Sequence, residues 1–158
     1  MNLLLVEDDL PKRIQIAEWV NEFLPDVVLT IEYSVNAAMR AIKNNLFDLI
    51  ILDMSLPTYT PMGNESGGRP QGFGGQEVLR LLDRRKLSPV VVVVTQFQTF
   101  GTGSELVTLE MLAESLNTVH PQTFRGIVFY EGANGSWKNV LHEKIFSAIQ
   151  LGESKNEI

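Results

Sequence analysis

The fold is decided by the stretch LIILDMSLP at residues 49–57. Four aliphatic residues run without interruption into Asp53, and Pro57 stops the regular structure shortly afterwards. An unbroken aliphatic run that ends at a proline is typical of a strand buried on both faces. Asp53 then lies at the carboxyl end of this strand, which is the edge where open parallel α/β sheets bind their ligands. The stretch therefore predicts a parallel sheet with a functional aspartate at its edge.

The composition indicates one globular domain. The chain has 158 residues, 44% hydrophobic and 20% charged, which suffices for a full core. A net charge of −6 argues against a nucleic-acid-binding face, which needs clustered Lys and Arg. The chain has no cysteine, and this excludes disulfides, thiolate catalysis and cysteine-ligated metals. No signal peptide and no membrane-spanning run is evident, so we expect a cytoplasmic protein with no membrane or nucleic-acid partner.

Strand and helix patterns alternate five times along the chain. Strands are expected at residues 3–6, 27–31, 47–53, 90–94 and 126–130, each followed by a helical pattern. This order predicts a doubly wound α/β sandwich, flavodoxin-like, with five parallel strands in the order 2-1-3-4-5. We expect a single domain at residues 1–152 with a long loop insertion at 58–74, and a frayed tail at 153–158.

Cap residues mark where several helices begin. Asp9 is expected to cap the first helix, Ser34 the second, and Ser104 the fourth. The first helix is also indicated by an apolar series at helical spacing, formed by Leu10, Ile14, Ala17, Val20 and Leu24. The third helix is expected from about Gln76 to Lys86.

Acidic residues follow two of the predicted strands. Glu7 and Asp8 come directly after the first strand, Asp53 ends the third, and Thr95 ends the fourth. The carboxyl ends of parallel strands share one edge, so these three carboxylates and the hydroxyl should converge. Crowded carboxylates are relieved by protonation or by a hard cation, and oxygen ligands of this kind suit Mg²⁺. A carboxylate beside such a metal can attack a phosphoryl group, with Thr95 donating a hydrogen bond to it.

Four motifs in this order resemble the receiver domains of bacterial response regulators. They are LLVEDD at residues 4–9, LDMSLP at 52–57, GQEVL at 75–79 and VVT ending at Thr95. Each motif alone is weakly specific, but four at β-α spacing are fairly specific. The resemblance covers residues 1–150, essentially the whole chain.

The resemblance implies a role for each site residue. Asp53 would accept a phosphoryl group from a histidine kinase or a histidine phosphotransfer protein. Glu7 and Asp8 would hold Mg²⁺ together with Asp53 and the backbone carbonyl of Ser55. Thr95 would be the switch hydroxyl. Tyr130, or alternatively Phe129, would be the switch aromatic. The switch would be read by another protein, by a homodimer or by a further part of the protein.

The sequence departs from the family in two places. The family carries a lysine at the end of its fifth strand, whereas here Phe129 is followed by Tyr130, Glu131 and Gly132. Lys138, one turn into the next helix, is the nearest lysine along the chain. The second departure is the insertion at 58–74, which could bind a partner, cover Asp53, bring Arg69 to the site, or do nothing.

Two other functions remain open beside the phosphoacceptor receiver. The missing lysine favours a degenerate receiver that binds partners without phosphorylation. A phosphohydrolase is disfavoured because Ser55 stands where a second acid would be needed, and we expect no enzymatic activity beyond self-phosphorylation and dephosphorylation. The glycine-rich stretches at 72–75 and 101–104 are interpreted as turns, and His120 and His142 as residues without a metal or triad partner.

Overall fold

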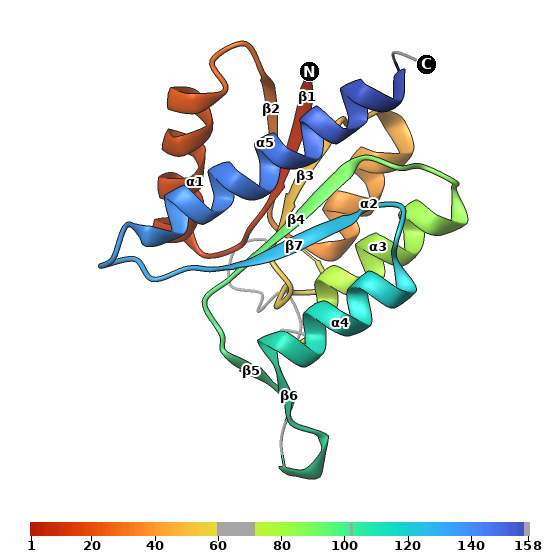
Figure 1. Ribbon diagram of the computed structural model, residues 1–158. Coiled ribbons are helices and arrows are strands. Elements are labelled where there is room, and N and C mark those ends of the chain that lie inside the picture. Colours follow the sequence, from red (N-terminus) through yellow and green to blue (C-terminus); the bar gives the residue numbers. More distant parts are fainter. Residues whose placement is uncertain (60–71, 102, 157–158) are drawn as a thin grey trace.

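The computed structural model describes residues 1–59, 72–101 and 103–156 (Figure 1). Its main sheet has five parallel strands in the order β2-β1-β3-β4-β7. In chain order the strands are β1 (Asn2–Val6), β2 (Val28–Glu32), β3 (Leu49–Leu52), β4 (Val90–Thr95) and β7 (Phe124–Phe129). The predicted fold class and strand order are confirmed, with β7 as the fifth strand of this sheet.

Helices cover both faces of the sheet. On one face lie α1 (Leu10–Phe23) and α5 (Ser136–Asn156); on the other lie α2 (Val35–Asn44), α3 (Gly74–Arg84) and α4 (Leu109–Val119) (Figure 1). Successive strand residues point to opposite faces. Leu3 and Leu5 therefore pack in the core with α1 and α5, whereas Leu4 and Val6 pack in the other core. Burial on both sides is why the central strands are aliphatic without interruption.

The strand register aligns the carboxyl ends of β1 and β3. Val6 pairs with Leu52, and Leu52 pairs in turn with Val93 of β4. The amide of Asp53 continues this ladder by donating to the Val6 carbonyl oxygen over 3.0 Å. The residues that follow Val6 and Leu52 are thereby held side by side at one edge.

The buried face of α1 differs from the predicted apolar series. Leu10 and Ile14 are exposed, at 55% and 47%, whereas Lys12, Ile16 and Trp19 are buried. Asp9 caps the helix as predicted, its side chain accepting from the amide of Lys12 over 3.1 Å. Val20 and Leu24 of the predicted series are buried, so the series identifies the inner face toward the end of the helix, whereas at its start the inner face begins at Lys12.

The fourth helix begins later than predicted. Ser104 lies in a short 3-10 helix (Gly103–Glu105) between two strands, β5 (Thr99–Phe100) and β6 (Val107–Thr108), that form an antiparallel hairpin. The cap of α4 is Thr108, whose hydroxyl accepts from the amide of Met111. By residue type serine caps helices slightly better than threonine, so the strand pairing and not the residue type selects Thr108.

Other boundaries shift by smaller amounts. Helix α3 begins at Gly74 rather than Gln76, and α5 continues to Asn156, through most of the tail expected to fray. Residues 60–71 of the insertion, with Arg69, lie outside the described residues. Within the described part of the chain, no helix is long and apolar enough to cross a membrane.

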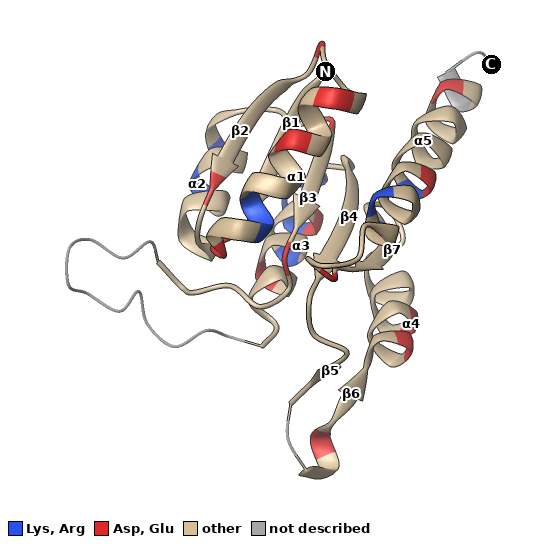
Figure 2. Ribbon diagram, turned by 90° about the vertical axis from the view of Figure 1, so that its left-hand side faces the viewer, with Lys and Arg blue, Asp and Glu red and all other residues tan. Residues whose placement is uncertain are grey.

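The basic residues of the helices do not gather on one element. Lysine and arginine positions are distributed over α1, α2, α3 and α5 (Figure 2).

His120 has a partner that its sequence neighbours do not reveal. It follows α4 and is buried, and its Nδ1 lies 2.6 Å from Oδ2 of Asp83 on α3. This contact pairs His120 with a single carboxylate and does not form the metal or triad site that the sequence disfavours. The contact links residues 37 positions apart. It connects the end of α4 to α3 on one face of the sheet.

Two glycines at the start of α3 allow the helix to approach the end of β3. A Cβ on Gly75 would lie 2.5 Å from the backbone oxygen of Asp53, and one on Gly74 would lie 2.8 Å from that of Leu56. Both glycines are helical, so the turn interpretation of this run is wrong for them. They are needed because a backbone passes where a side chain would stand.

We predict that Gly75→Ala lowers the free energy of unfolding by roughly 1–3 kcal/mol, because the added methyl group displaces the Asp53 backbone. Gly152→Ala is the matched control, since Gly152 is also helical but has open space around its Cα. The control should be neutral or stabilising by up to about 1 kcal/mol. Urea denaturation of both variants measures the difference, and equal stabilities would contradict the prediction.

Candidate functional site

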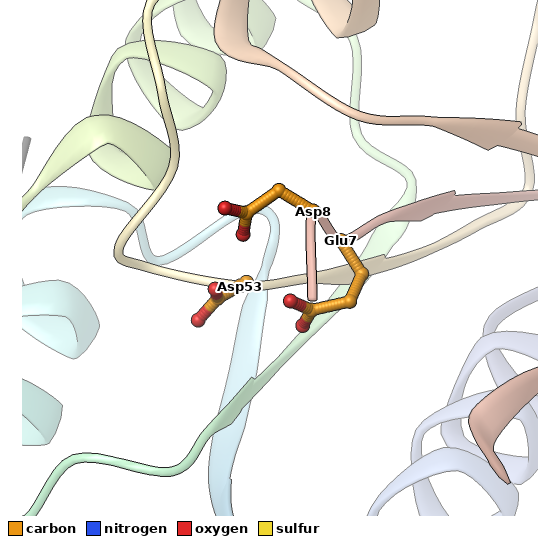
Figure 3. Close-up of side chains that lie close together, drawn as sticks. All are labelled: Glu7, Asp8 and Asp53. Carbon is orange, nitrogen blue, oxygen red and sulfur yellow. The ribbon is translucent and has the colours of Figure 1, made fainter. Parts of the chain in front are cut away.

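Three carboxylates meet at the carboxyl edge of the sheet. Glu7 and Asp8 follow β1, and Asp53 follows β3. Each offers one oxygen, and these oxygens all lie within 4.8 Å of one another. Figure 3 shows the side chains directed toward a common space. The predicted convergence of the three acids is confirmed.

The backbone fixes where these carboxylates stand. The Glu7 amide donates to the carbonyl oxygen of Glu32 over 3.1 Å, just as Asp53 is held by Val6. Glu7 and Asp53 are almost fully buried, at 1% and 5% exposure, whereas Asp8 is exposed. The cluster therefore has a dry interior and one acid at its mouth.

A lysine ammonium lies inside the acidic cluster. Lys12, in the first turn of α1, is fully buried, and its Nζ lies 2.6 Å from Oε2 of Glu7 and 3.3 Å from Oδ1 of Asp53. The same Nζ donates to the Val94 carbonyl oxygen over 2.8 Å. Three acceptors match the three protons of an ammonium group. Lys12 thus links Glu7 and Asp53, which follow β1 and β3 in the chain, to the end of β4.

Burial dominates the electrostatics of the acids. It raises the pKa of Glu7 from 4.5 to about 8, although the Lys12 ammonium acts in the opposite direction. Burial also raises the pKa of Asp53, and here too the Lys12 ammonium acts in the opposite direction. The pKa of Asp8 is raised by the partial burial of its carboxylate at the edge of the cluster. A site with this preference for protons also favours another cation, because a cation removes the cost of dehydrated negative charge.

The remaining predicted residues occupy the same edge. Thr95 is buried at the end of β4, and its Oγ1 accepts from the Phe97 amide over 3.2 Å. The amide of Ser55 approaches Oδ1 of Asp53 at 3.4 Å. Tyr130 is buried beside Trp137, with 5.2 Å between the ring centroids. Its amide donates to the Thr95 carbonyl oxygen.

Lys12 is the site residue that sequence reasoning missed. Lys138 was the nearest lysine along the chain, yet it lies on α5 with its Nζ 5.8 Å from the Trp137 ring centroid. The usable signal was helical phase, because Lys12 lies four residues before Ile16 and seven before Trp19. A lysine in line with a buried stripe at a strand-helix junction points toward the sheet edge.

The donor set is suited to a hard divalent cation. All three groups in the cluster present carboxylate oxygens, and one of them is open to solvent. Mg²⁺ binds one or two carboxylates and retains several waters, so it does not need a closed protein cage. Lys12 occupies part of the space around Glu7 and Asp53, which leaves Asp8 as the acid at the entrance.

Sequence relatives align along nearly the whole chain. The uncharacterized protein y4jR of Sinorhizobium fredii is 32% identical over 143 residues, covering 89% of this chain and 94% of its own length. The Detocs response regulatory protein DtcB of Enterobacter cloacae is 28% identical over 149 residues, covering 92% of this chain and 98% of its own. No family model matches the chain.

The fold is shared with a solved structure. The response regulator receiver domain protein (CheY-like) of Methanospirillum hungatei superposes with a TM-score of 0.62 at 18% identity. The match covers 98% of this chain and 97% of that one. This likeness independently supports the architecture of the sheet and helices.

We predict that Glu7 makes metal-free protein less stable as pH rises. The folded state keeps the Glu7 proton up to about pH 8, whereas a free glutamate loses it near 4.5. The folded state therefore binds more protons, so this contribution is complete below pH 4.5 and is lost as pH rises through 8. Asp8 and Asp53 act in the same direction.

Glu7→Gln cannot ionise and should flatten part of this decline. Urea denaturation with a chelator present, at several pH values from 5 to 9, measures the effect. An unchanged pH slope in Glu7→Gln would contradict the assignment.

Proposed function

Because this chain belongs to the response regulator receiver family, we propose that Asp53 accepts a phosphoryl group from a histidine kinase or a histidine phosphotransfer protein. The observation that carries the proposal is the meeting of Glu7, Asp8 and Asp53 at one sheet edge. A single acid after a strand has many structural explanations. Three that converge from two strands fit a divalent cation and an anionic reactant.

The transfer is a displacement at phosphorus. A carboxylate oxygen of Asp53 attacks the phosphorus of a phosphohistidine, forming a P–O bond as the P–N bond breaks. The imidazole leaves with the electron pair of that bond and takes its proton from water. Glu7, Asp8, Asp53 and the Ser55 carbonyl would hold Mg²⁺, which would supply positive charge against the phosphoryl oxygens.

Thr95 is the proposed switch hydroxyl. Its oxygen accepts from the Phe97 amide, which leaves its own proton free to reach a phosphoryl oxygen. Phe97 begins the segment leading to the β5–β6 hairpin and α4. A movement of Thr95 would therefore be transmitted to this segment and to β7, where Tyr130 is the proposed switch aromatic. A downstream protein or a second copy would read the altered face.

A second candidate function is a degenerate receiver that binds partners without phosphorylation. Lys12 is the observation that favours it, because its ammonium already contacts both Glu7 and Asp53, where a metal would otherwise bind. Such a chain would keep the fold but would not change conformation in response to phosphorylation. Phosphodonor treatment distinguishes the two functions.

We predict that acetyl phosphate with Mg²⁺ adds one phosphoryl group to the protein and that Asp53→Asn abolishes this reaction. Asp48→Asn is the matched control, since Asp48 precedes the same strand β3 and is exposed at its opposite end. Intact-mass spectrometry at acid pH measures the adduct. An unmodified wild-type protein would support the degenerate receiver, and modification of Asp53→Asn would place the phosphoryl group elsewhere.

We predict that Mg²⁺ raises the stability of the protein through Asp8. Saturating metal at about one hundred times its Kd should add about 2.7 kcal/mol to the free energy of unfolding. Asp8→Asn should lose most of this gain, because it removes the carboxylate at the mouth of the cluster. Asp9→Asn is the control, since asparagine caps a helix as well as aspartate. Thermal unfolding with Mg²⁺ or chelator compares the variants, and equal metal responses would contradict the assignment.

A further inference from the structure

We propose that Lys12 supplies the cation that contacts the phosphoryl group on Asp53, in place of the lysine that is missing from the end of the last sheet strand. This inference rests on the proposed phosphoacceptor function. It assigns to α1 a contact that the family resemblance would assign to the strand end. The argument depends on where the Lys12 ammonium lies and on which of its partners can change.

The Lys12 ammonium is already at the reacting carboxylate. Its Nζ is 3.3 Å from Oδ1 of Asp53, and it is fully buried. A phosphoryl group bonded to Asp53 adds oxygens that project from this carboxylate. An ammonium beside the aspartate is therefore placed to contact these oxygens without any backbone rearrangement.

The partners of Lys12 divide into one fixed and two exchangeable acceptors. The Val94 carbonyl oxygen, 2.8 Å from Nζ, is a neutral backbone group in β4 and is retained whatever happens at the acids. The Glu7 and Asp53 carboxylates are the same groups that would bind a metal. A divalent ion there would repel the ammonium from Glu7, and the flexible lysine chain can turn about its Val94 anchor toward the phosphoryl oxygens.

The end of β7 and the side chain of Lys12 lie close to each other at the site. Tyr130 stands directly after β7, at the strand end that carries no lysine, and its ring centroid is 6.0 Å from Nζ of Lys12. Tyrosine brings no positive charge to the site. Lys12 reaches the same region from the opposite side, so the charge lost from the strand end is present in the site but carried by a helix.

The experiment compares phosphorylation of the full chain in three variants. Lys12→Met removes the charge and keeps most of the volume. Lys138→Met removes the exposed lysine of α5 as a matched control. The double variant Lys12→Met with Tyr130→Lys restores a positive charge to the site, now from the end of β7. Rates are measured by intact mass with acetyl phosphate and Mg²⁺, and Mg²⁺ binding is measured separately by calorimetry.

Lys12→Met should be phosphorylated roughly 100-fold more slowly, as expected for loss of one preorganised group at a transition state. It should still bind Mg²⁺, and more tightly, because a competing cation is gone. Lys138→Met should react like the wild type, and the double variant should recover at least part of the lost rate. A wild-type rate in Lys12→Met, or no recovery in a folded double variant, overturns the proposal while the phosphoacceptor function stands.

A measurement on the wild type covers the case in which Lys12→Met does not fold. In protein labelled with ¹⁵N-lysine, the buried Lys12 ammonium exchanges slowly and is distinguished from exposed lysines. Beryllofluoride added in the presence of Mg²⁺ should shift this signal beyond the shift caused by Mg²⁺ alone. A signal that responds to Mg²⁺ but not to beryllofluoride overturns the Lys12 contact, whereas a wild type that acetyl phosphate leaves unmodified overturns the phosphoacceptor function itself.

Discussion

The ion pairs of Lys12 are the interaction on which this site depends. Burying Glu7 and Asp53 side by side would be very unfavourable if both were charged and unpaired, and the pKa of Glu7 is raised accordingly. One ammonium, shared among both carboxylates and the Val94 carbonyl, offsets that cost. Removing one partner of such a buried group typically costs about 3–5 kcal/mol. The acids can therefore remain close together in the folded protein.

The scaffold places the acids through backbone contacts and the lysine through helix packing. The β1–β3 register sets Glu7 beside Asp53, and the ladder continues past both strand ends. Gly75 lets α3 pass close against the Asp53 backbone from one face. Lys12 enters from the other face, on a helix that Ile16 and Trp19 anchor in the core. The chemistry thus sits between two packed layers, which leaves little freedom for the Asp53 carboxylate to move.

The strand patterns predict the acids directly, whereas finding their counter-ion requires the helical phase of α1. Glu7, Asp8 and Asp53 follow aliphatic strands, and any parallel sheet brings the ends of its strands to one edge. Lys12 lies in the first turn of α1, where Leu10 and Ile14 of the predicted apolar series are exposed instead of buried. The Asp83–His120 contact spans two helices, and the start of α4 depended on a hairpin. What sequence leaves open is set by contacts between segments distant along the chain.

If Asp53 is phosphorylated as proposed, the element that carries the cation decides which parts of the fold respond. A lysine at the strand end would act on β7, the strand next to Thr95. Lys12 instead belongs to α1, whose buried Ile16 and Trp19 share a core with Trp137 and Leu141 of α5. A shift of Lys12 toward a phosphoryl group would displace α1 relative to α5. A shift of Thr95 would displace the segment that leads to α4. These two displacements would occur on opposite faces of the sheet. A partner that binds α1 and α5 would therefore respond to Lys12, and one that binds α4 would respond to Thr95.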